Sequence, residues 1–292
     1  MDGAGFRFDF FGGSADGVGQ AAAATTVASG DEVGAGMLEL VGSDKVAQLG
    51  DEAFVSQRVQ GATPSVLQVR TLSSSATESA AKRLEGVDPS VTDLVPGRYE
   101  GGFTVWECSL DLASLVLREH CGGGGMSGRR VLELGCGHGI PGIVCAMHGA
   151  SVTFQDFNRE VLEHVTVVNV SRNVAQGEDR GPRTDACVQY LYGPWSRLSG
   201  EGALLPSGSF DLILSAETIY DRASVPSLCR AMRHALAPGA VALVAAKVFY
   251  FGVGGGVSDF VRVAEAEGFA VREVASYDDG ANNMRKILSL TS

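Results

Sequence analysis

The chain has 292 residues, enough for one large domain or for a domain of about 200 residues with an appendage. Its formal net charge of −11 argues against nucleic-acid binding, which normally needs clustered Lys and Arg, and favours a basic protein as partner. Six cysteines show no metal-ligand spacing, so we expect no metal site, only free thiols of a reducing compartment. The most apolar stretch, 240–257, is interrupted by Lys247 and by glycines, and no membrane span is expected.

Residues 1–90 differ in composition from the rest of the chain. Gly, Ala and Ser dominate 12–36, which leaves too little apolar surface to offset the entropy of ordering. The opening segment 6–11 is unusually aromatic, and it either docks on the domain or binds a partner. Short apolar groups can still form local strands packed on the core (37–40, 54–55 and 66–69). We expect an N-terminal extension, partly disordered or packed on the core, followed by a domain at 91–292.

Strands and helices alternate in the domain. The predicted strands are 131–134, 151–156, 186–192, 210–215, 240–249, 269–276 and 285–291, and the predicted helices are 110–117, 140–148, 159–173, 226–236 and 257–267. This alternation implies an α/β fold, a mainly parallel sheet with helices on both faces. The short turn-rich segment 277–283 makes the last two strands antiparallel.

The segment 131–142, VLELGCGHGIPG, predicts a strand, a glycine turn and a helix. Glycines allow a tight turn and a close approach of the backbone to a ligand, beside the N–H groups of the helix start. Glu133 stands two residues before Gly135 and Gly137, as in the S-adenosylmethionine (SAM) pattern E-x-G-x-G-x-G, where a carboxylate can hold the methionyl ammonium. NAD-binding loops share the G-x-G-x-x-G spacing and a downstream acid, but Glu133 favours SAM.

Ligands in such sheets lie beyond the carboxyl ends of the strands, where strand order reverses. Asp156 ends the second strand, so its carboxylate either binds the ribose hydroxyls of the cofactor or caps a turn. Gln155 and Phe157 flank it, and Phe157 can lie beside the adenine. Trp195 follows the third strand and either covers the adenine or packs in the core. Ser215, at the end of the fourth strand, is expected in the same crevice.

Glu217 and Tyr220 follow the fourth strand and are the candidate catalytic residues. A carboxylate and a phenol three residues apart can orient a nucleophile and line its channel. The alternative interpretation is a helix cap with a packed tyrosine. The glycine-rich segment 250–257 lies on the same side of the predicted sheet, where it either lets a peptide backbone pass or serves as a hinge.

With these segments assembled, the chain resembles the histidine protein methyltransferase family, also called methyltransferase-like protein 18. The resemblance covers about residue 93 to the C-terminus and rests on DLVPGRYEGGFTVWECSLDL (93–112), VLELGCGHGIPGI (131–143), FQDFN (154–158), DLILSAETIY (211–220) and YFGVGGGV (250–257). It implies a class I methyltransferase (Rossmann-like) fold, seven strands with an antiparallel last one. It also implies transfer of a methyl group from SAM, leaving S-adenosyl-L-homocysteine, to the tau nitrogen of a histidine in a large-subunit ribosomal protein.

Carried over residue by residue, the resemblance implies a cofactor site of several segments. Its members are Trp106, Glu107, Cys108, Ser109, Leu110 and Asp111, then Gly135, Gln155, Asp156 and Phe157, and finally Gly193, Pro194, Trp195 and Ser215 or Ala216. Pro194 stands where the family usually has an acid, which puts the contacts of that turn in doubt. We expect a monomer in the cytoplasm and nucleus, with no direct contact to nucleic acid or membrane.

The chemistry suits these residues, because a histidine with an unperturbed pKa of about 6.5 is mostly neutral at physiological pH and needs no strong base. The hypothesis is that Glu217, helped by Tyr220, accepts a hydrogen bond from the second ring N–H and so selects the reactive tautomer. A lysine methyltransferase of the same fold is the nearest alternative, since related families carry D-x-x-Y here. A non-catalytic chaperone of a basic ribosomal protein and an NAD oxidoreductase are further alternatives.

Overall fold

The computed structural model describes residues 34–37, 51–61, 66–81, 92, 94–122, 125–174, 187–278, 280 and 284–292. The aromatic segment 6–11 therefore lies outside the described residues. None of the helices in the described ranges has the length and apolar character that crossing a membrane requires. All six cysteines are free thiols, and all but Cys187 are buried.

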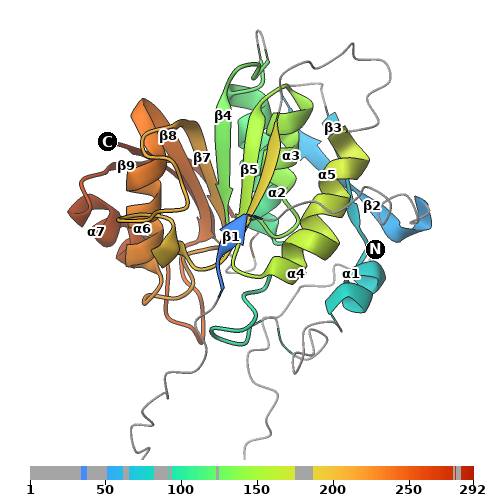
Figure 1. Ribbon diagram of the computed structural model, residues 1–292, viewed down its shortest axis with the longest axis horizontal. Helices are drawn as coiled ribbons and strands as arrows, with labels where there is room; N and C mark the ends of the chain where they lie inside the picture. Colours follow the sequence, from blue (N-terminus) through green and yellow to red (C-terminus); the bar gives the residue numbers. More distant parts are fainter. Residues whose placement is uncertain are drawn as a thin grey trace, which may run out of the picture.

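An eight-stranded mixed sheet forms the centre of the molecule (Figure 1), in the order β1-β6-β5-β4-β7-β8-β10-β9. Its strands are β1 (Gly36–Met37), β4 (Arg130–Leu134), β5 (Ser151–Asp156), β6 (Val188–Tyr192), β7 (Phe210–Ala216), β8 (Leu236–Lys247), β9 (Ala270–Tyr277) and β10 (Arg285–Thr291). Strands β4 to β8 pair in parallel, and β10 runs antiparallel to both β8 and β9. The predicted fold class, with its antiparallel last strand, is confirmed.

The strand count differs from the predicted seven because of β1. This two-residue strand comes from the N-terminal extension and pairs antiparallel with β6, at the edge of the sheet. Its Gly-Met sequence has no alternating pattern that would predict a strand. Ala35, just before it, packs against Gly193, where a side-chain Cβ would come within 2.4 Å of the Ala35 Cβ.

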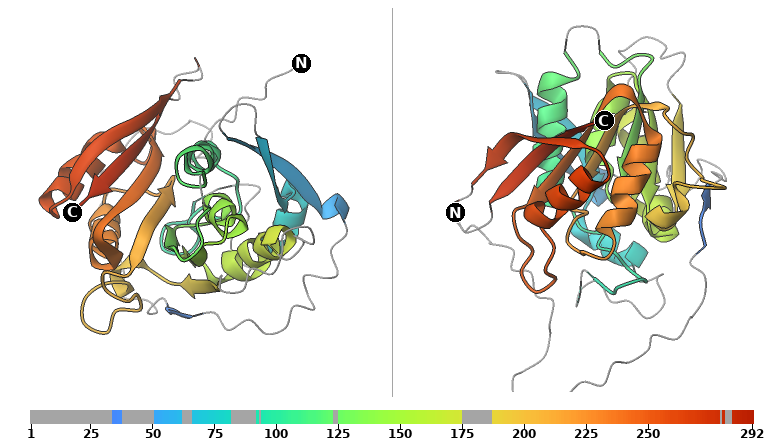
Figure 2. Two further views of the ribbon diagram at one scale, coloured as in Figure 1. Left: turned by 90° about the horizontal axis from the view of Figure 1, so that it is seen from above. Right: turned by 90° about the vertical axis from the view of Figure 1, so that its left-hand side faces the viewer.

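Helices cover both faces of the sheet (Figure 2). They are α1 (Ser74–Ala81), α2 (Glu107–Glu119), α3 (Ile140–Met147), α4 (Arg159–Val161), the π-helical turn η3 (Leu162–Thr166), α5 (Val167–Val174), α6 (Val225–Ala235) and α7 (Val257–Ala266), with 3-10 turns η2 (Asp51–Ala53) and η4 (Trp195–Arg197). Alternate residues of one strand enter different cores, because side chains of a strand point to opposite faces. Leu212 and Leu214 pack in the core that contains Leu115 of α2, whereas Ile213 packs with Met232 of α6.

Three elements differ from their predicted form. Strand β8 begins at Leu236, inside the predicted helix 226–236, and ends at Lys247 rather than at residue 249. The predicted helix 110–117 begins earlier, at Glu107, so that the buried Cys108 extends its apolar face. The predicted helix 159–173 is divided by a π-helical turn, a feature that often occurs at functional sites. Thr166 in that turn donates a hydrogen bond from its hydroxyl to the Gly137 carbonyl, 2.6 Å away. The irregularity thus places a hydroxyl against the glycine turn.

A separate hairpin of β2 (Phe54–Gln60) and β3 (Val66–Leu72) packs on one side of the domain, far from α7 (Figures 1 and 2). Strand β2 lies against α2, and β3 lies against α5. Val59 and Val69 are fully buried in the same core as α2 and α3. Residues of the N-terminal extension therefore contribute to the core of the domain.

Asn169 joins this hairpin to the glycine turn. Its side-chain oxygen accepts a hydrogen bond from the Leu72 N–H at 2.8 Å, and its amide nitrogen donates to the His138 carbonyl at 3.1 Å. The Asn169 side chain is fully buried. Removing it would leave the Leu72 N–H and the His138 carbonyl without these partners, in a place that water does not reach.

We expect Asn169→Ala to lower the free energy of unfolding by about 2–3 kcal/mol, because buried polar groups lose their partners. Chemical denaturation measures the change. Asn173→Ala is the matched control: Asn173 bonds the backbone of Arg70 from a half-exposed position, where water can replace it. Equal losses for the two variants would contradict the role of burial.

Candidate active site

A cleft with an open volume of about 1100 Å³, counted out to solvent, lies beyond the carboxyl ends of β4, β5 and β7. Most of the predicted site residues line it: Trp106, Ser109, Glu133, Gly135, Gly137, Asp156, Phe157, Gly193, Pro194, Trp195, Ala216, Glu217 and Tyr220. These residues come from distant parts of the sequence, and the parallel strands bring them together because their carboxyl ends meet at one edge of the sheet.

The glycine turn after β4 has a backbone conformation that residues with a side chain cannot adopt easily. Gly135, Gly137 and Gly139 have φ angles of +63°, +48° and +72°, in the left-handed region. A Cβ on Gly135 would lie 2.6 Å from the Thr218 side chain, and one on Gly137 would lie 3.2 Å from the Gly102 carbonyl. The turn therefore presents bare backbone to the cleft.

Glu133 lies at the floor of the cleft and is almost fully buried, with 2% of its surface exposed. One carboxyl oxygen accepts a hydrogen bond from the Gly142 N–H at 2.8 Å. Burial raises the pKa of Glu133 to about 8, an effect that this hydrogen bond only partly offsets. Glu133 is therefore mainly protonated at pH 7, until a cation comes close to it.

Asp156 holds the other side of the turn. Its two carboxyl oxygens accept hydrogen bonds from the backbone N–H groups of Gly137, at 2.9 Å, and Asn158, at 3.0 Å. Burial raises the pKa of Asp156 to about 6, and the two hydrogen bonds favour its charged form. Each carboxylate oxygen has more than one acceptor position, so Asp156 can still accept hydrogen bonds from ribose hydroxyls.

Gln155 lies beneath the cleft and does not line it. Its side-chain oxygen accepts hydrogen bonds from the Gly135 N–H, at 3.2 Å, and from the Trp195 indole, at 2.9 Å. Its amide nitrogen donates to the Gly193 carbonyl at 2.8 Å. Gln155 thus fixes the indole ring of Trp195 at the wall of the cleft, a role that its position in the sequence does not indicate.

Glu217 is the single described residue other than glycine with a positive φ, +58°. It is 7% exposed and lines the cleft. Its Oε2 accepts a hydrogen bond from the Tyr250 hydroxyl at 2.6 Å, and its Oε1 lies 3.6 Å from the Lys247 ammonium. Oε1 makes no hydrogen bond within the described part of the chain. A strained, buried carboxylate with one unused acceptor atom is typical of a functional position.

Tyr220 also lines the cleft, but its hydroxyl donates to Glu100 rather than to Glu217. Burial raises the pKa of both Tyr220 and Glu100, so the phenol keeps its proton. The Tyr220 ring meets the Tyr250 ring edge-on, with centroids 6.3 Å apart. The structure therefore pairs Glu217 with Tyr250, and Tyr220 with Glu100. Neither Tyr250 nor Glu100 was among the predicted site residues, although both belong to the quoted motifs.

Six predicted cofactor residues lie outside the lining of the cleft: Glu107, Cys108, Leu110, Asp111, Gln155 and Ser215. Cys108 is buried in the core, and Asp111 forms an ion pair of 2.7 Å with Arg285. The Ser215 hydroxyl donates to the Leu134 carbonyl at 3.0 Å and so ties β7 to β4. Their direct contact with a cofactor stays a prediction.

His138 lines the cleft within the glycine turn and was not predicted. Its Nε2 lies 3.0 Å from the Phe103 carbonyl, and its Nδ1 lies 3.2 Å from the Asn169 amide nitrogen. Burial lowers the pKa of His138 to about 4, so the ring is neutral at pH 7. Nε2–H then donates to Phe103, and His138 links the 101–105 loop to the turn.

The comparisons with known proteins agree with this geometry. A family model described as lysine methyltransferase matches residues 97–250. The chain belongs to this methyltransferase family. It is 37% identical to a histidine protein methyltransferase 1 homolog of Dictyostelium discoideum, over 69% of this chain and 61% of that protein. The homolog of Rattus norvegicus is 36% identical, over 65% and 57%. Protein N-lysine methyltransferase METTL21A of Danio rerio is 33% identical, over 50% and 61%.

The chain spans about three fifths of the length of these curated relatives. The resemblance to the histidine protein methyltransferases is confirmed, and the family implies S-adenosylmethionine as the cofactor. The donor set fits it, with a buried acid for an ammonium, a second acid for ribose hydroxyls and the flat Trp195 ring for a purine. We expect Glu133, Asp156 and Trp195 to hold these three parts. Within the described residues, no group of His, Cys, Asp or Glu is arranged to bind a metal.

Binding of S-adenosylhomocysteine at pH 7 should release up to about one proton. The pKa of Glu133 is about 8, and an ammonium beside it favours the ionised form. Affinity should therefore rise between pH 7 and 8, where Asp156, with its pKa of about 6, is already ionised. Calorimetry in buffers of different ionisation enthalpy measures the release. Glu133→Gln should abolish it, and a release that persists in this variant would show that Glu133 does not bind the ammonium.

Proposed function

We propose that the chain is a SAM-dependent protein-histidine N-methyltransferase that modifies the tau nitrogen of an imidazole. The observation that carries the proposal is the buried Oε1 of Glu217, an acceptor that no described residue hydrogen-bonds, on a side chain that lines the cleft. A histidine ring presents an N–H on one side and a lone pair on the other. The names of several relatives, histidine protein methyltransferase 1, support the same target residue.

The residues of the chain orient the imidazole. The cofactor supplies an electrophilic methyl group when bound, and catalysis rests mainly on positioning and on exclusion of water. The Glu217 carboxylate accepts the hydrogen bond of the ring N–H, which turns the lone pair of the other nitrogen away from Glu217 and towards the cofactor. Tyr250, through its hydrogen bond to Oε2, keeps Oε1 in place. No base needs to remove a proton before attack, because the imidazole is already neutral at pH 7.

A protein-lysine methyltransferase is the second candidate. The description of the family model and the relative METTL21A favour it. A lysine must lose a proton before it attacks, because its unperturbed pKa is about 10.4. Glu217 is the nearest candidate to accept that proton, and it is already paired with the Lys247 ammonium at 3.6 Å. Mass spectrometry of the methylated product separates the two candidates.

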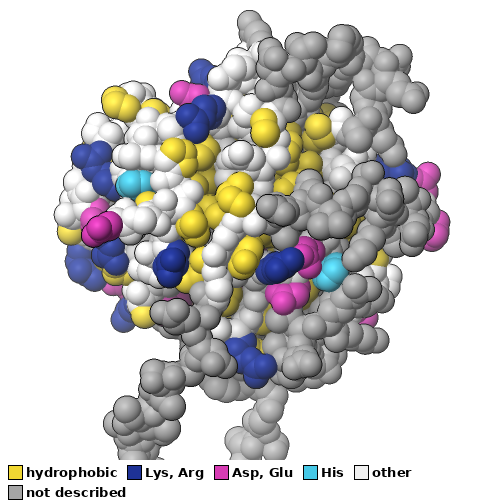
Figure 3. Space-filling model, viewed as in Figure 1, with side chains coloured by type: hydrophobic (Ala, Val, Ile, Leu, Met, Phe, Trp, Pro, Cys, Tyr) yellow, Lys and Arg dark blue, Asp and Glu magenta, His cyan; other side chains and the backbone are white. Residues whose placement is uncertain are grey.

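We propose that the substrate is a basic protein, namely a ribosomal protein of the large subunit. We also propose that the enzyme is a monomer that acts in the cytoplasm and nucleus. The net charge of −11 favours association with a basic partner. On the face in Figure 3, the Lys and Arg side chains of the described residues are scattered among Asp and Glu. Such a surface does not resemble the clustered basic footprint of a nucleic-acid-binding protein.

Incubation of the enzyme with labelled SAM and purified large-subunit ribosomal proteins should label a histidine. Glu217→Ala should reduce labelling about tenfold or more, since an oriented imidazole is lost, while affinity for S-adenosylhomocysteine stays within about twofold. Glu201→Ala, an exposed acid outside the cleft, is the matched control. Label on lysine alone would contradict the proposed function, and unchanged turnover would remove Glu217 from the mechanism.

An exposed aromatic pair next to the cleft suits a protein substrate. Phe249 and Phe251 are 49% and 72% exposed, and their ring centroids lie 5.0 Å apart. The segment that carries them is attached to the cleft, because the Gly255 N–H donates to the Tyr220 carbonyl at 2.9 Å. Exposed apolar side chains at the mouth of a site are characteristic of protein recognition.

We expect Phe251→Ala to raise KM for the protein substrate about fivefold, because an apolar contact is lost, and to leave cofactor affinity unchanged. Steady-state kinetics with the ribosomal protein that the wild-type enzyme methylates measure the change in KM. Val55→Ala, which truncates an exposed apolar side chain on the distant β2–β3 hairpin, should not change KM. An equal KM for the two variants would place substrate recognition elsewhere.

A further inference from the structure

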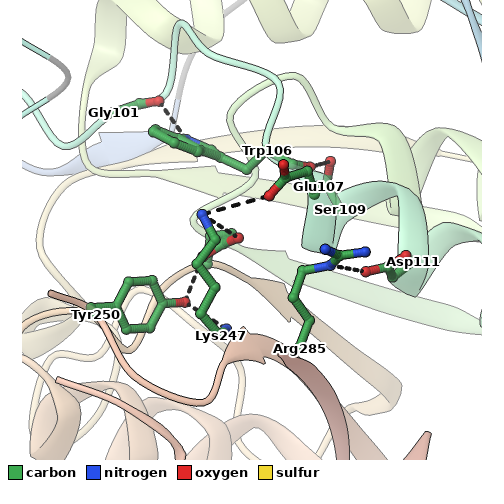
Figure 4. A network of polar contacts seen from close by, with 9 residues as sticks. Gly101, Trp106, Glu107, Ser109, Asp111, Lys247, Tyr250 and Arg285 are labelled. Atoms are coloured by element: carbon green, nitrogen blue, oxygen red, sulfur yellow. Dashed lines mark hydrogen bonds and ion pairs between the residues drawn. The ribbon is translucent and has the colours of Figure 1, made fainter. Parts of the chain in front are cut away.

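Lys247, the last residue of β8, is a buried cation that points toward Glu107 and Trp106 (Figure 4). It is 7% exposed. Its ammonium lies 3.6 Å from Glu217 Oε1 and 3.6 Å from Glu107 Oε2, and 5.4 Å from the centre of the Trp106 ring. One cation is thus shared by two carboxylates and rests over an aromatic face.

The two carboxylates differ in burial. The Glu107 side chain is 46% exposed, so solvent screens its interaction with Lys247. The Glu217 side chain is 5% exposed, and its charge is shielded from water. Lys247 therefore acts chiefly on Glu217, whose side chain lines the cleft.

Other titratable groups packed here do not alter this balance. Burial raises the pKa of Cys108 and of Tyr250, as do the Glu217 charge and the hydrogen bond that each side chain makes with Glu217, so both stay neutral. Asp111 of α2 is paired with Arg285 of β10 at 2.7 Å, as Figure 4 also shows. The charges that face the unused acceptor atom are thus those of Glu217 and Lys247, with Glu107 at the exposed side.

We propose that Lys247 is a specificity-determining residue that makes the site accept a neutral imidazole and reject a lysine ammonium. The inference rests on the proposed function and names the group that sets its target residue. An ammonium drawn to Glu217 would lie beside Lys247, and like charges repel strongly where water is excluded. A neutral ring N–H brings no net charge and still meets the Glu217 Oε1 acceptor.

Lys247 also bears on Glu217 through its backbone. Its N–H lies 3.3 Å from the Tyr250 hydroxyl that bonds to Glu217 Oε2. The end of β8 thus sets both the charge beside the acceptor and the orientation of the acceptor.

The test uses two peptides of one sequence, taken around the histidine that the wild-type enzyme methylates, with His or Lys at that position. We expect the wild type to bind the His peptide about tenfold or more tightly than the Lys peptide. Lys247→Met should reduce this preference about tenfold. Lys247→Arg should restore the wild-type preference, since the charge is kept.

Lys286→Met is the matched control, because Lys286 lies on the neighbouring strand β10 opposite Ala246 and pairs with Glu273 outside the cleft. It should keep the wild-type preference. An unchanged preference in Lys247→Met would overturn the inference and leave the proposed function standing. Absence of histidine methylation by the wild type would instead refute the proposed function itself.

A second measurement does not depend on how the variants fold. The wild-type complex with S-adenosylhomocysteine is titrated at pH 8 with 4-methylimidazole, which is mainly neutral there, and with n-butylamine, which is protonated. We expect 4-methylimidazole to bind about tenfold or more tightly, because n-butylammonium meets Lys247. Equal affinity of the two compounds would overturn the inference.

Discussion

The hydrogen bonds that hold the turn after β4 are the constraint on which the rest of the site depends. The turn needs left-handed glycines, and its backbone groups must find partners because the surroundings are buried. Asp156 binds the Gly137 N–H, Gln155 binds the Gly135 N–H and Thr166 binds the Gly137 carbonyl. These partners come from β5 and from the π-helical turn, so the cofactor cleft forms only when the neighbouring elements are in register.

Three buried acids serve this cleft, and the structure stabilises each in a different way. Glu133 is left mainly neutral, with a pKa of about 8, whereas Asp156 receives two backbone N–H groups and has a pKa of about 6. Glu217 is paired with Lys247 and with the Tyr250 hydroxyl. All three carboxyl groups lose their hydration on burial, but different interactions offset that loss in each case. Glu133 can therefore become charged when a cofactor ammonium binds, whereas the charge of Glu217 is balanced by Lys247 before any substrate binds.

The sequence predicts those features that depend on neighbours along the chain. Alternating apolar residues in β5 and the apolar run in β7 predict strands, and the glycines after Glu133 predict the turn. Contacts between distant residues leave no such pattern. Gln155 meets Trp195 across 40 positions, and the sequence shows only a glutamine beside an acid. In the same way, Tyr220 is closer to Glu217 in sequence than Tyr250 is, yet Tyr250 is the residue that bonds to Glu217. The reason is that the segment after β8 folds back on the end of β7.

A shared fold cannot by itself decide between histidine and lysine, since relatives named for either residue match this chain. The difference must lie in the free energy of the target side chain inside the cleft. An ammonium carries a charge into the site and has to lose a proton there, whereas an imidazole enters neutral. A carboxylate alone would favour the ammonium. A carboxylate already balanced by a lysine removes that advantage and keeps its hydrogen-bond acceptor, so the preference that we propose depends on one charge at the end of β8.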